Sequence, residues 1–173
     1  MLKKLLASIG IGKAKIDTIL LEEQLRAGDN FNIEIVITGG DVEQELNAIE
    51  LAIMAESKAE AELSDGDDTY IEVQVLQHWT EQLNLTIQPG EVISNQLELH
   101  LHPEIPATSL FGHEIGRVWL ETGLDIKNGL DGSDADPLII VPSPTQMAVL
   151  EMFQQSGFRL FNLFQSNHAS DAS

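Results

Sequence analysis

The sequence predicts an all-β protein built as an antiparallel β-sandwich, and two observations support that prediction. Aliphatic side chains alternate with polar ones in several short segments, most clearly at Phe31, Ile33, Ile35 and Ile37. About seven such segments follow one another with turn residues and little helical pattern between them, which is typical of two stacked sheets. The chain has 173 residues, enough to bury such a core, and it contains no cysteine, so no disulfide framework is expected.

The expected strands run from 15–21 to 137–141, each bounded by glycine, proline or other turn residues. Successive side chains of a strand point to opposite faces, so the aliphatic rows are expected to face the core and the polar rows the solvent. One strand should therefore turn Ile71, Val73 and Val75 inward, and a separate strand is expected around 83–87, where Leu83, Leu85 and Ile87 alternate again. All strand pairs are expected to be antiparallel, because little helix separates the strands.

Between the strands we expect several irregular segments. Residues 56–62 fit either an extension of the strand before them or a helical turn. Residues 64–68 and 104–116 are rich in turn residues and predict loops. The strand that carries Trp119 is expected to break into a loop at Gly123.

The N-terminal residues predict a short amphipathic helix. Its apolar face and the glycines that end it are Leu2, Leu5, Leu6 and Ile9, then Gly10 and Gly12. The first fifteen residues contain four lysines and no acidic residue, so this segment has three alternative docking sites: the acidic body, a neighbouring subunit or an anionic membrane. Its apolar part is short for a secretion signal, and no run is long enough to span a membrane, so we expect a cytoplasmic protein.

A second helix is expected near the C-terminus. Ser143 can cap it, Pro144 suits its first position, and Gly157 is placed to end it. Its apolar stripe comprises Met147, Leu150 and Phe153. Residues 158–164 are apolar on both faces, unlike a solvated edge strand, and residues 165–173 form a polar tail that we expect to be disordered.

The formal net charge is −19, from 28 acidic and 9 basic residues. Binding to phosphate backbones needs clustered lysine and arginine, so this balance argues against DNA or RNA as a partner. It is equally compatible with a requirement for solubility.

Two acidic clusters contain ligand types that hard cations prefer. The weak candidates for a Ca²⁺ site are Asp131, Asp134 and Asp136. A similar, less favoured cluster comprises Asp65, Asp67 and Asp68. Neither cluster has the spacing of an EF-hand, so polar loops are the simpler interpretation and no bound metal is predicted.

Histidines and a serine supply the other candidate chemistry. His100 and His102 share a strand face, and with His113 they are candidate Zn²⁺ or Ni²⁺ ligands, although solvated histidines are the simpler interpretation. Ser109, His113 and Glu114 are the residue types of a catalytic triad, but no nucleophile elbow surrounds the serine. No glycine-rich phosphate loop is present, so we predict no enzyme activity and no cofactor. The two tryptophans, Trp79 and Trp119, are expected in or beside the core rather than against a ligand.

Four segments in order along the chain carry a family resemblance. They are Lys3-Lys4-Leu5-Leu6-Ala7-Ser8-Ile9-Gly10-Ile11-Gly12 with 14–18, Gly39-Gly40-Asp41-Val42-Glu43-Gln44-Glu45, Val118-Trp119-Leu120-Glu121-Thr122-Gly123-Leu124-Asp125-Ile126, and 148–150 with Gly157-Phe158-Arg159-Leu160. Together they resemble the sporulation-control protein family over roughly residues 2–160. Each segment alone is a weak signal, and the order of all four is what makes the resemblance specific.

The resemblance implies an arrestin-like fold, that is, an immunoglobulin-like antiparallel β-sandwich without a known catalytic centre. Members of the family usually have two such sandwiches joined near a helix that matches residues 144–156. We therefore expect an arrestin-like sandwich over 1–142 and a disordered tail over 165–173. Residues 143–164 would then be a connecting helix and an apolar strand, as a remnant or start of a second sandwich.

From the resemblance and the residues together, we predict a non-enzymatic adaptor that binds other proteins and regulates stress or developmental control. It would use strand edges and its apolar C-terminal segment, and it would form a homo-oligomer, most simply a two-fold dimer. The predicted interaction residues are Met147, Leu150, Phe153, Phe158, Leu160, Phe161, Leu163 and Phe164. The alternatives are a peripheral membrane sensor that uses the N-terminal amphipathic helix, and a metal-binding domain.

Overall fold

The computed structural model describes residues 12–63, 66–111, 113–127 and 132–158, with the backbone alone at 58–70. The predicted N-terminal helix, the apolar run beyond Phe158 and the tail at 165–173 lie outside these residues. The proposed domain boundaries at 142 and 164 therefore stay a prediction.

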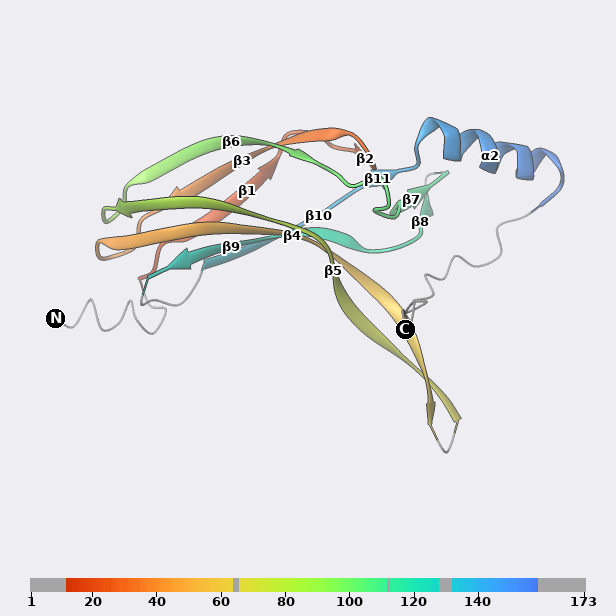
Figure 1. Ribbon diagram of the computed structural model, residues 1–173, viewed down its shortest axis with the longest axis horizontal. Helices are drawn as coiled ribbons and strands as arrows, with labels where there is room; N and C mark the ends of the chain where they lie inside the picture. Colours follow the sequence, from red (N-terminus) through yellow and green to blue (C-terminus); the bar gives the residue numbers. More distant parts are fainter. Residues whose placement is uncertain (1–11, 64–65, 112, 128–131, 159–173) are drawn as a thin grey trace, which may run out of the picture.

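Two antiparallel sheets face each other and form a sandwich, as predicted (Figure 1). The smaller sheet contains, in spatial order, β1 (Lys15–Leu20), β3 (Asn30–Thr38) and β6 (Val92–His100). The larger sheet contains, in spatial order, β10 (Gly132–Pro137), β9 (Val118–Ile126), β4 (Gln44–Leu63) and β5 (Gly66–Ile87). The strand β5 thus lies at one edge of the larger sheet.

Two short strand pairs complete the end of the sandwich. The strands β2 (Leu25–Arg26) and β11 (Ile140–Val141) pair in parallel, so the expectation of antiparallel pairs throughout is wrong at this point. A parallel pair is possible here because the two strands are far apart in the chain and need no tight turn between them. The strands β7 (Ser109–Leu110) and β8 (His113–Glu114) form a small hairpin within 104–116, the segment predicted to be a loop.

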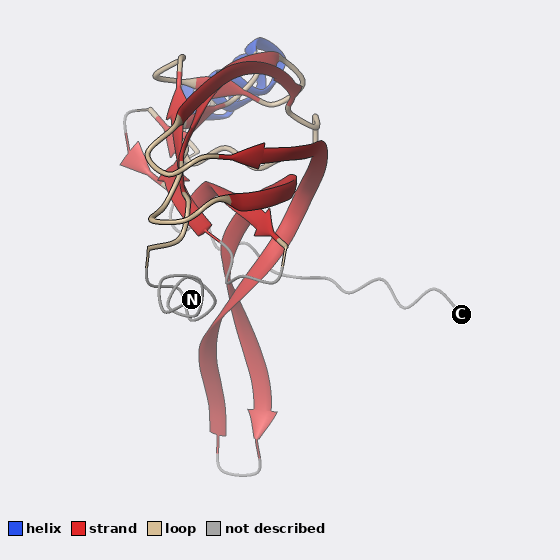
Figure 2. Ribbon diagram, turned by 90° about the vertical axis from the view of Figure 1, so that its left-hand side faces the viewer, coloured by secondary structure: helices blue, strands red, loops and turns tan. Residues whose placement is uncertain are grey.

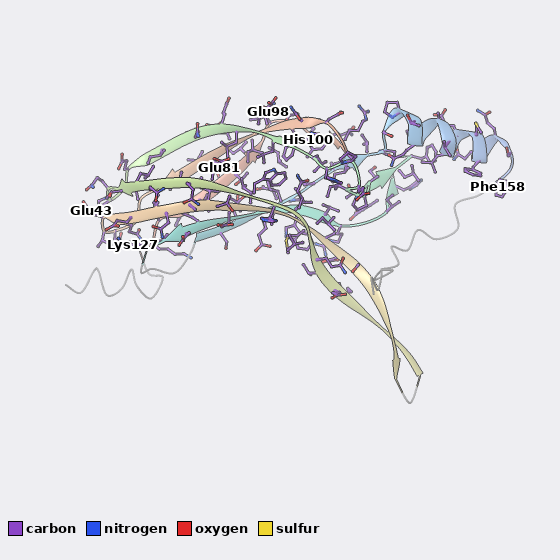
Figure 3. The ribbon with its side chains drawn as sticks, in the orientation of Figure 1. Glu43, Glu81, Glu98, His100, Lys127 and Phe158 are labelled. Atoms are coloured by element: carbon purple, nitrogen blue, oxygen red, sulfur yellow. The ribbon has the colours of Figure 1, made fainter. Side chains whose placement is uncertain are left out.

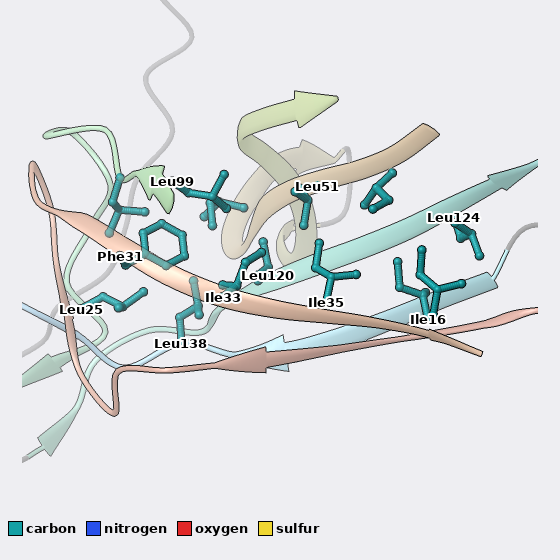
Figure 4. Close-up of a cluster of buried hydrophobic side chains, with 14 of the residues drawn as sticks. Ile16, Leu25, Phe31, Ile33, Ile35, Leu51, Leu99, Leu120, Leu124 and Leu138 are labelled. Atoms are coloured by element: carbon teal, nitrogen blue, oxygen red, sulfur yellow. The ribbon is translucent and has the colours of Figure 1, made fainter. Parts of the chain in front are cut away.

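The core follows the predicted alternation most closely in β3 and β9, the central strands. In β3, Phe31, Ile33, Ile35 and Ile37 are all buried, and every second residue of β9 from Val118 to Ile126 is buried as well. Figure 4 shows Phe31, Ile33 and Ile35 of β3 with Leu120 and Leu124 of β9 in the core between the two sheets. Interdigitation of the two inner faces makes the dry centre that a sandwich requires.

Polar contacts join the two sheets along the side where β1 lies beside β10. The hydroxyl of Thr18 on β1 donates to the hydroxyl of Thr122 on β9, with the two oxygens 2.9 Å apart and both residues buried. The backbone N–H of Thr18 donates to Oδ2 of Asp134 on β10 at 2.8 Å. These bonds satisfy polar groups that the sandwich would otherwise bury without partners.

The segment with Asp134 and Asp136 is not the polar loop that we predicted, because it forms β10 against β9. The strand β9 also continues through Gly123 without the predicted break, since Gly123 pairs with Glu50 on one side and Ser133 on the other. Ladder pairing on both sides holds this glycine extended, although glycine alone favours a break.

The strands β4 and β5 form a single hairpin of unusual length, with 20 and 22 residues. The pairing of β4 with β9 ends at Ala55 and Val118, but the pairing of β4 with β5 continues to Leu63 and Gly66. Figures 1 and 2 show this two-stranded part projecting from the sandwich. We call residues 56–63 and 66–75 the arm.

The hairpin decides one open expectation and corrects two others. Residues 56–62 extend the strand, which is one of the two alternatives that we gave, and residues 66–68 belong to β5 rather than to the predicted loop. The segments around 71–76 and 83–87, which were expected as separate strands, are both parts of β5. The separating polar residues at 77–82 stay extended because they pair with Ala48–Ile53 of β4.

The predicted C-terminal helix is confirmed as α2 (Pro144–Gln155). The side chain of Ser143 accepts from the N–H of Gln146, the Gln146 side chain accepts from the N–H of Ser143, and this capping box defines the start of the helix. Gly157 adopts a φ of 86° after the last turn, as a helix C-terminus requires. Figure 3 shows α2 beside the sandwich, with Phe158 beyond its far end.

Two glycines of the family motif mark a place where backbones touch. A Cβ at Gly40 would lie 1.9 Å from the carbonyl oxygen of Gly12, and one at Gly39 would lie 2.0 Å from that of Gln88. The N–H of Asp41 donates to the Gly12 oxygen at 2.8 Å. No side chain fits at either position, which explains in physical terms why the motif has two glycines there.

Candidate interaction surface

The arm exposes the apolar residues that we expected to be buried. The exposed fractions of Ile71, Val73 and Val75 are 66%, 51% and 59%, so the predicted inward orientation of this row is wrong. The reason is a register shift, because Ile53 pairs with Gln77 whereas the next residue, Met54, pairs with Val75. The additional residue, Leu76, reverses the alternation of β5, and the row that should face the core faces outward instead.

The same bulge marks the point where β5 leaves the sandwich. The side-chain amide of Gln77 donates to the carbonyl oxygen of His100 at 2.8 Å and accepts from the N–H of His102 at 2.9 Å. These bonds tie β5 to the end of β6. Beyond Gln77, toward the tip, β5 pairs with β4 alone among the described strands.

The free edge of β5 leaves backbone groups unpaired. Every second residue of an edge strand presents its N–H and its C=O to the open side, where another strand can bond to them. Of the features that protect natural edges, β5 lacks lysine and proline but has the bulge at Leu76 and the inner-face charge of Glu72. Its outer row at the base of the arm is aliphatic.

The apolar surface continues from the arm across the outer face of the larger sheet. Val75, Met54, Trp119 and Pro137 are consecutive partners in the strand register, so their side chains lie in one row across four strands. Arg117 lies beside this row, with Nη1 2.9 Å from Oε1 of Glu56.

Trp119 lines a groove of about 730 Å³ next to the base of the arm, and its walls come from the β7–β8 hairpin and from the ends of β9 and β10. The lining residues are Glu56, Thr108, Ser109, Glu114, Gly116, Arg117, Val118, Trp119, Ala135, Pro137, Leu138 and Ile139. The half-buried Trp119 agrees with the prediction of a tryptophan beside the core. Trp79 points inward instead and packs edge-on against Phe31, with ring centroids 6.4 Å apart.

The triad-type residues do not assemble into a catalytic arrangement. Ser109 pairs with Glu114 across the β7–β8 hairpin, so these two share one face, whereas His113 pairs with Leu110. Neighbours along a strand point to opposite faces, which separates His113 from Glu114 and Ser109. His100, His102 and His113 are exposed, and Nδ1 of His100 lies 3.0 Å from Oδ1 of Asn30.

The acidic residues of β10 form a close pair at the side of the sandwich. Burial, then the neighbouring carboxylate of Asp134 and then that of Asp17 together raise the pKa of Asp136 from 3.8 to about 6. The Oδ2 atom of Asp136 is buried without a hydrogen-bond partner among the described residues. Of the other members of the predicted acidic clusters, Asp131 and Asp65 lie outside the described residues, and only the backbone of Asp67 and Asp68 is described.

Among the residues that the structure describes, no three His, Cys, Asp or Glu side chains are grouped so as to hold a metal ion. The carboxylate of Asp134 accepts from the N–H of Thr18, and the carboxylate of Asp136 lies next to that of Asp134, so the two do not surround an open site. The structure therefore gives Asp134 and Asp136, the two described Ca²⁺ candidates, a structural position at the seam between β1 and β10.

The helix α2 offers a second apolar surface. None of its residues is buried, and Met152, Phe153 and Phe158 expose 66%, 53% and 64% of their surface. The rings of Phe153 and Phe158 contact each other edge-on at 5.6 Å. The half-buried Met147 and Leu150 complete the described part of the predicted interaction set, and Leu160, Phe161, Leu163 and Phe164 lie outside the described residues.

Comparison with known proteins identifies the family. The model of the Spo0M family, described as SpoOM protein, matches residues 2–170. The chain belongs to the Spo0M family. The sporulation-control protein Spo0M of Bacillus subtilis is 31% identical to it over 160 residues, which are 91% of this chain and 58% of that protein. The chain thus spans less than two thirds of the length of this relative.

A solved structure confirms the fold of this Spo0M-family chain. The crystal structure of Spo0M from Bacillus subtilis superimposes with a TM-score of 0.77 at 28% sequence identity, covering 88% of this chain and 59% of that one. The resemblance inferred from the four sequence segments is therefore confirmed, as is the sandwich that it implied. No helix in the described part of the chain is long and apolar enough to cross a membrane.

Proposed function

We propose that this chain is a cytoplasmic, non-enzymatic protein-interaction module that acts in regulation of the sporulation-control type. The observation that carries the proposal is the arm, where β5 combines an unpaired edge with the exposed row Ile71, Val73 and Val75. Strand addition to such an edge provides main-chain hydrogen bonds and side-chain contacts together. The arm would bind a partner protein in this way.

The low stability expected of an isolated two-stranded arm supports this proposal. A two-stranded hairpin is at best marginally stable alone in water, and a third strand or a packed face is what usually stabilises it. Beyond the bond from the N–H of Glu56 to the carbonyl oxygen of Arg117, the arm has no third strand among the described elements, and its described aliphatic row is exposed. A partner strand would satisfy the edge and cover part of this row.

The regulatory part of the proposal comes from the relative. The Bacillus subtilis protein is named a sporulation-control protein, and this chain matches 58% of its length. We extend that role to this chain as a regulatory adaptor, without a catalytic step, since Ser109, His113 and Glu114 do not converge.

Site-specific photo-crosslinking tests the proposal. A photoreactive amino acid replaces Val73 on the arm in one variant and Val92 on β6 in the control, where the exposed fraction is a similar 61%. We expect discrete crosslinked adducts in cells from position 73 and none from position 92. Equal labelling from both positions, or none from position 73, would show that the arm is not the binding surface.

We also propose self-association through α2, because its apolar residues are exposed and a two-fold dimer is the simplest arrangement that covers them. Sedimentation velocity at micromolar concentration should show a dimer for the unaltered chain. The combined replacement of Phe153 and Phe158 by serine should convert it to a monomer. A monomer before the change, or a dimer after it, would contradict this part of the proposal.

A further inference from the structure

We infer that the free edge of β5 selects an extended peptide segment with apolar side chains at every second position and a basic side chain between them, next to Glu72. This inference rests on the proposed function, since it names the chemistry of the strand that the arm would bind. It follows from the two faces of β5 at the base of the arm, which differ in character.

The outer face sets the apolar half of the pattern. A strand added beside β5 places every second side chain directly next to Ile71, Val73 and Val75, which are 66%, 51% and 59% exposed. All three are β-branched and therefore stiff, so they form a preformed surface that loses little freedom on binding. Apolar partners at alternate positions would bury this row, and polar ones would leave it in water.

The inner face sets the basic half. Glu72 is exposed between Ile71 and Val73, and its carboxylate has no cationic partner among the described side chains. The nearest described cation on the arm's base, Arg117, is already paired with Glu56 on the outer face. Opposite charges on neighbouring strands stabilise a sheet, so a lysine or arginine is the residue that this position favours.

The charge of β5 favours a basic heterologous segment over a second copy of the same chain. The strand β5 contains four acidic residues and no lysine or arginine, so the same edge of a second copy is repelled, whereas a basic peptide is attracted. The two occupants also respond to salt in opposite directions. Screening weakens attraction to a basic peptide and relieves the repulsion between two acidic copies.

The probe for this inference is a fluorescent peptide of about nine residues with alternating valine and lysine, titrated with the full chain and followed by anisotropy. There are three comparison peptides. The first has glutamate in place of lysine, the second has the same composition with the valines grouped together, and the third has a proline at its centre. We expect the alternating basic peptide to bind about ten-fold tighter than each comparison peptide, and to weaken several-fold between about 50 and about 300 mM salt.

Variants locate the site. Val73→Ser should weaken the basic peptide about ten-fold by removing an apolar contact, and Glu72→Gln should weaken it several-fold and reduce its salt dependence. The matched controls are Val92→Ser and Glu98→Gln on β6, where both residues are similarly exposed. Neither control should change the affinity. All four positions are on the surface, so circular dichroism should show unaltered folding.

The outcomes separate this inference from the function on which it rests. Equal binding of the lysine and glutamate peptides, with loss of binding to the proline peptide, would overturn the basic specificity and leave strand addition standing. If the grouped and proline peptides bound as tightly as the alternating basic peptide, strand addition itself would be overturned. Self-association that strengthens with salt and is lost in Val73→Ser would show that the arm binds a second copy, which would also overturn the inference.

Discussion

The two halves of the β4–β5 hairpin share an alternating pattern but have opposite environments. Within the sandwich, β4 lies between β9 and β5 and is covered by the smaller sheet, so Leu51 and Ile53 are fully buried. In the arm, the same two strands lack a third neighbour, and Ile71 and Val73 are mostly exposed. The comparison teaches that alternation identifies a strand, whereas burial depends on what lies beside and above it.

The largest effect that tests this comparison is expected in the buried half. Leu51→Ala should lower the free energy of unfolding by about 2–5 kcal/mol, because it removes a fully buried side chain and leaves a cavity. Urea denaturation measures the change. The control is Val92→Ala on β6, at an exposed position, which should cost less than about 0.5 kcal/mol. Similar losses in both variants would remove the distinction between covered and uncovered strand surfaces.

A smaller effect should come from the polar bond between the sheets. Thr122→Val should cost about 1–3 kcal/mol, because it removes the acceptor 2.9 Å from the Thr18 hydroxyl and leaves that hydroxyl buried. The double variant with Thr18→Val should be closer in stability to the unaltered protein than the single variant, since both polar groups are then absent. Thermal unfolding of the four proteins in this cycle checks the prediction. Additive losses would show that the bond is unimportant.

The body of the sandwich was predictable from local pattern, whereas the arm was not. The alternation in β3 and the capping residues around Ser143 gave correct elements, because each depends on a few neighbouring residues. The orientation of Val73 depended on the bulge at Leu76, and nothing in the residues there distinguishes a bulge from a regular strand.

The candidate surface was missed for the same reason. Its signals were present, since β5 has a 22-residue stretch without lysine, arginine or proline, but the sequence does not say where the opposing sheet ends. Likewise, β10 appeared to be a polar loop because its strand is stabilised by a distant residue, Thr18, whose N–H donates to Asp134. The interaction residues predicted on α2 are exposed as a binding surface requires, and their role stays a prediction.

The acidic pair of β10, Asp134 and Asp136, should make the stability of the sandwich depend on pH. The pKa of Asp136 in the folded protein is about 6, above the ordinary 3.8, so folding favours its protonated form. This contribution to stability is fully present below about pH 4 and is lost as the pH rises through about 6. Asp136→Asn should therefore raise the free energy of unfolding by about 1 kcal/mol at neutral pH, after allowance for solvent screening, and change little at about pH 3.5.

Denaturation profiles across this pH range measure the difference between the two proteins. Glu98→Gln, at an exposed position on β6, is the control and should show no such crossover. A constant difference between Asp136→Asn and the unaltered protein at every pH would mean that titration of this carboxyl does not contribute to stability.

The smallest effect is expected in the arm itself, and it makes the most direct comparison. Val118 lies at the last rung shared by β9 and β4 and is 4% exposed, whereas Val73 is 51% exposed on the arm. Val73→Ser should change the free energy of unfolding by less than about 0.5 kcal/mol, because this side chain is already in water. The same substitution at Val118 should cost about 2 kcal/mol or more, since it places a hydroxyl in the core. Equal losses at the two sites would show that Val73 packs against another part of the chain, and the arm would then be covered from within rather than open to a partner.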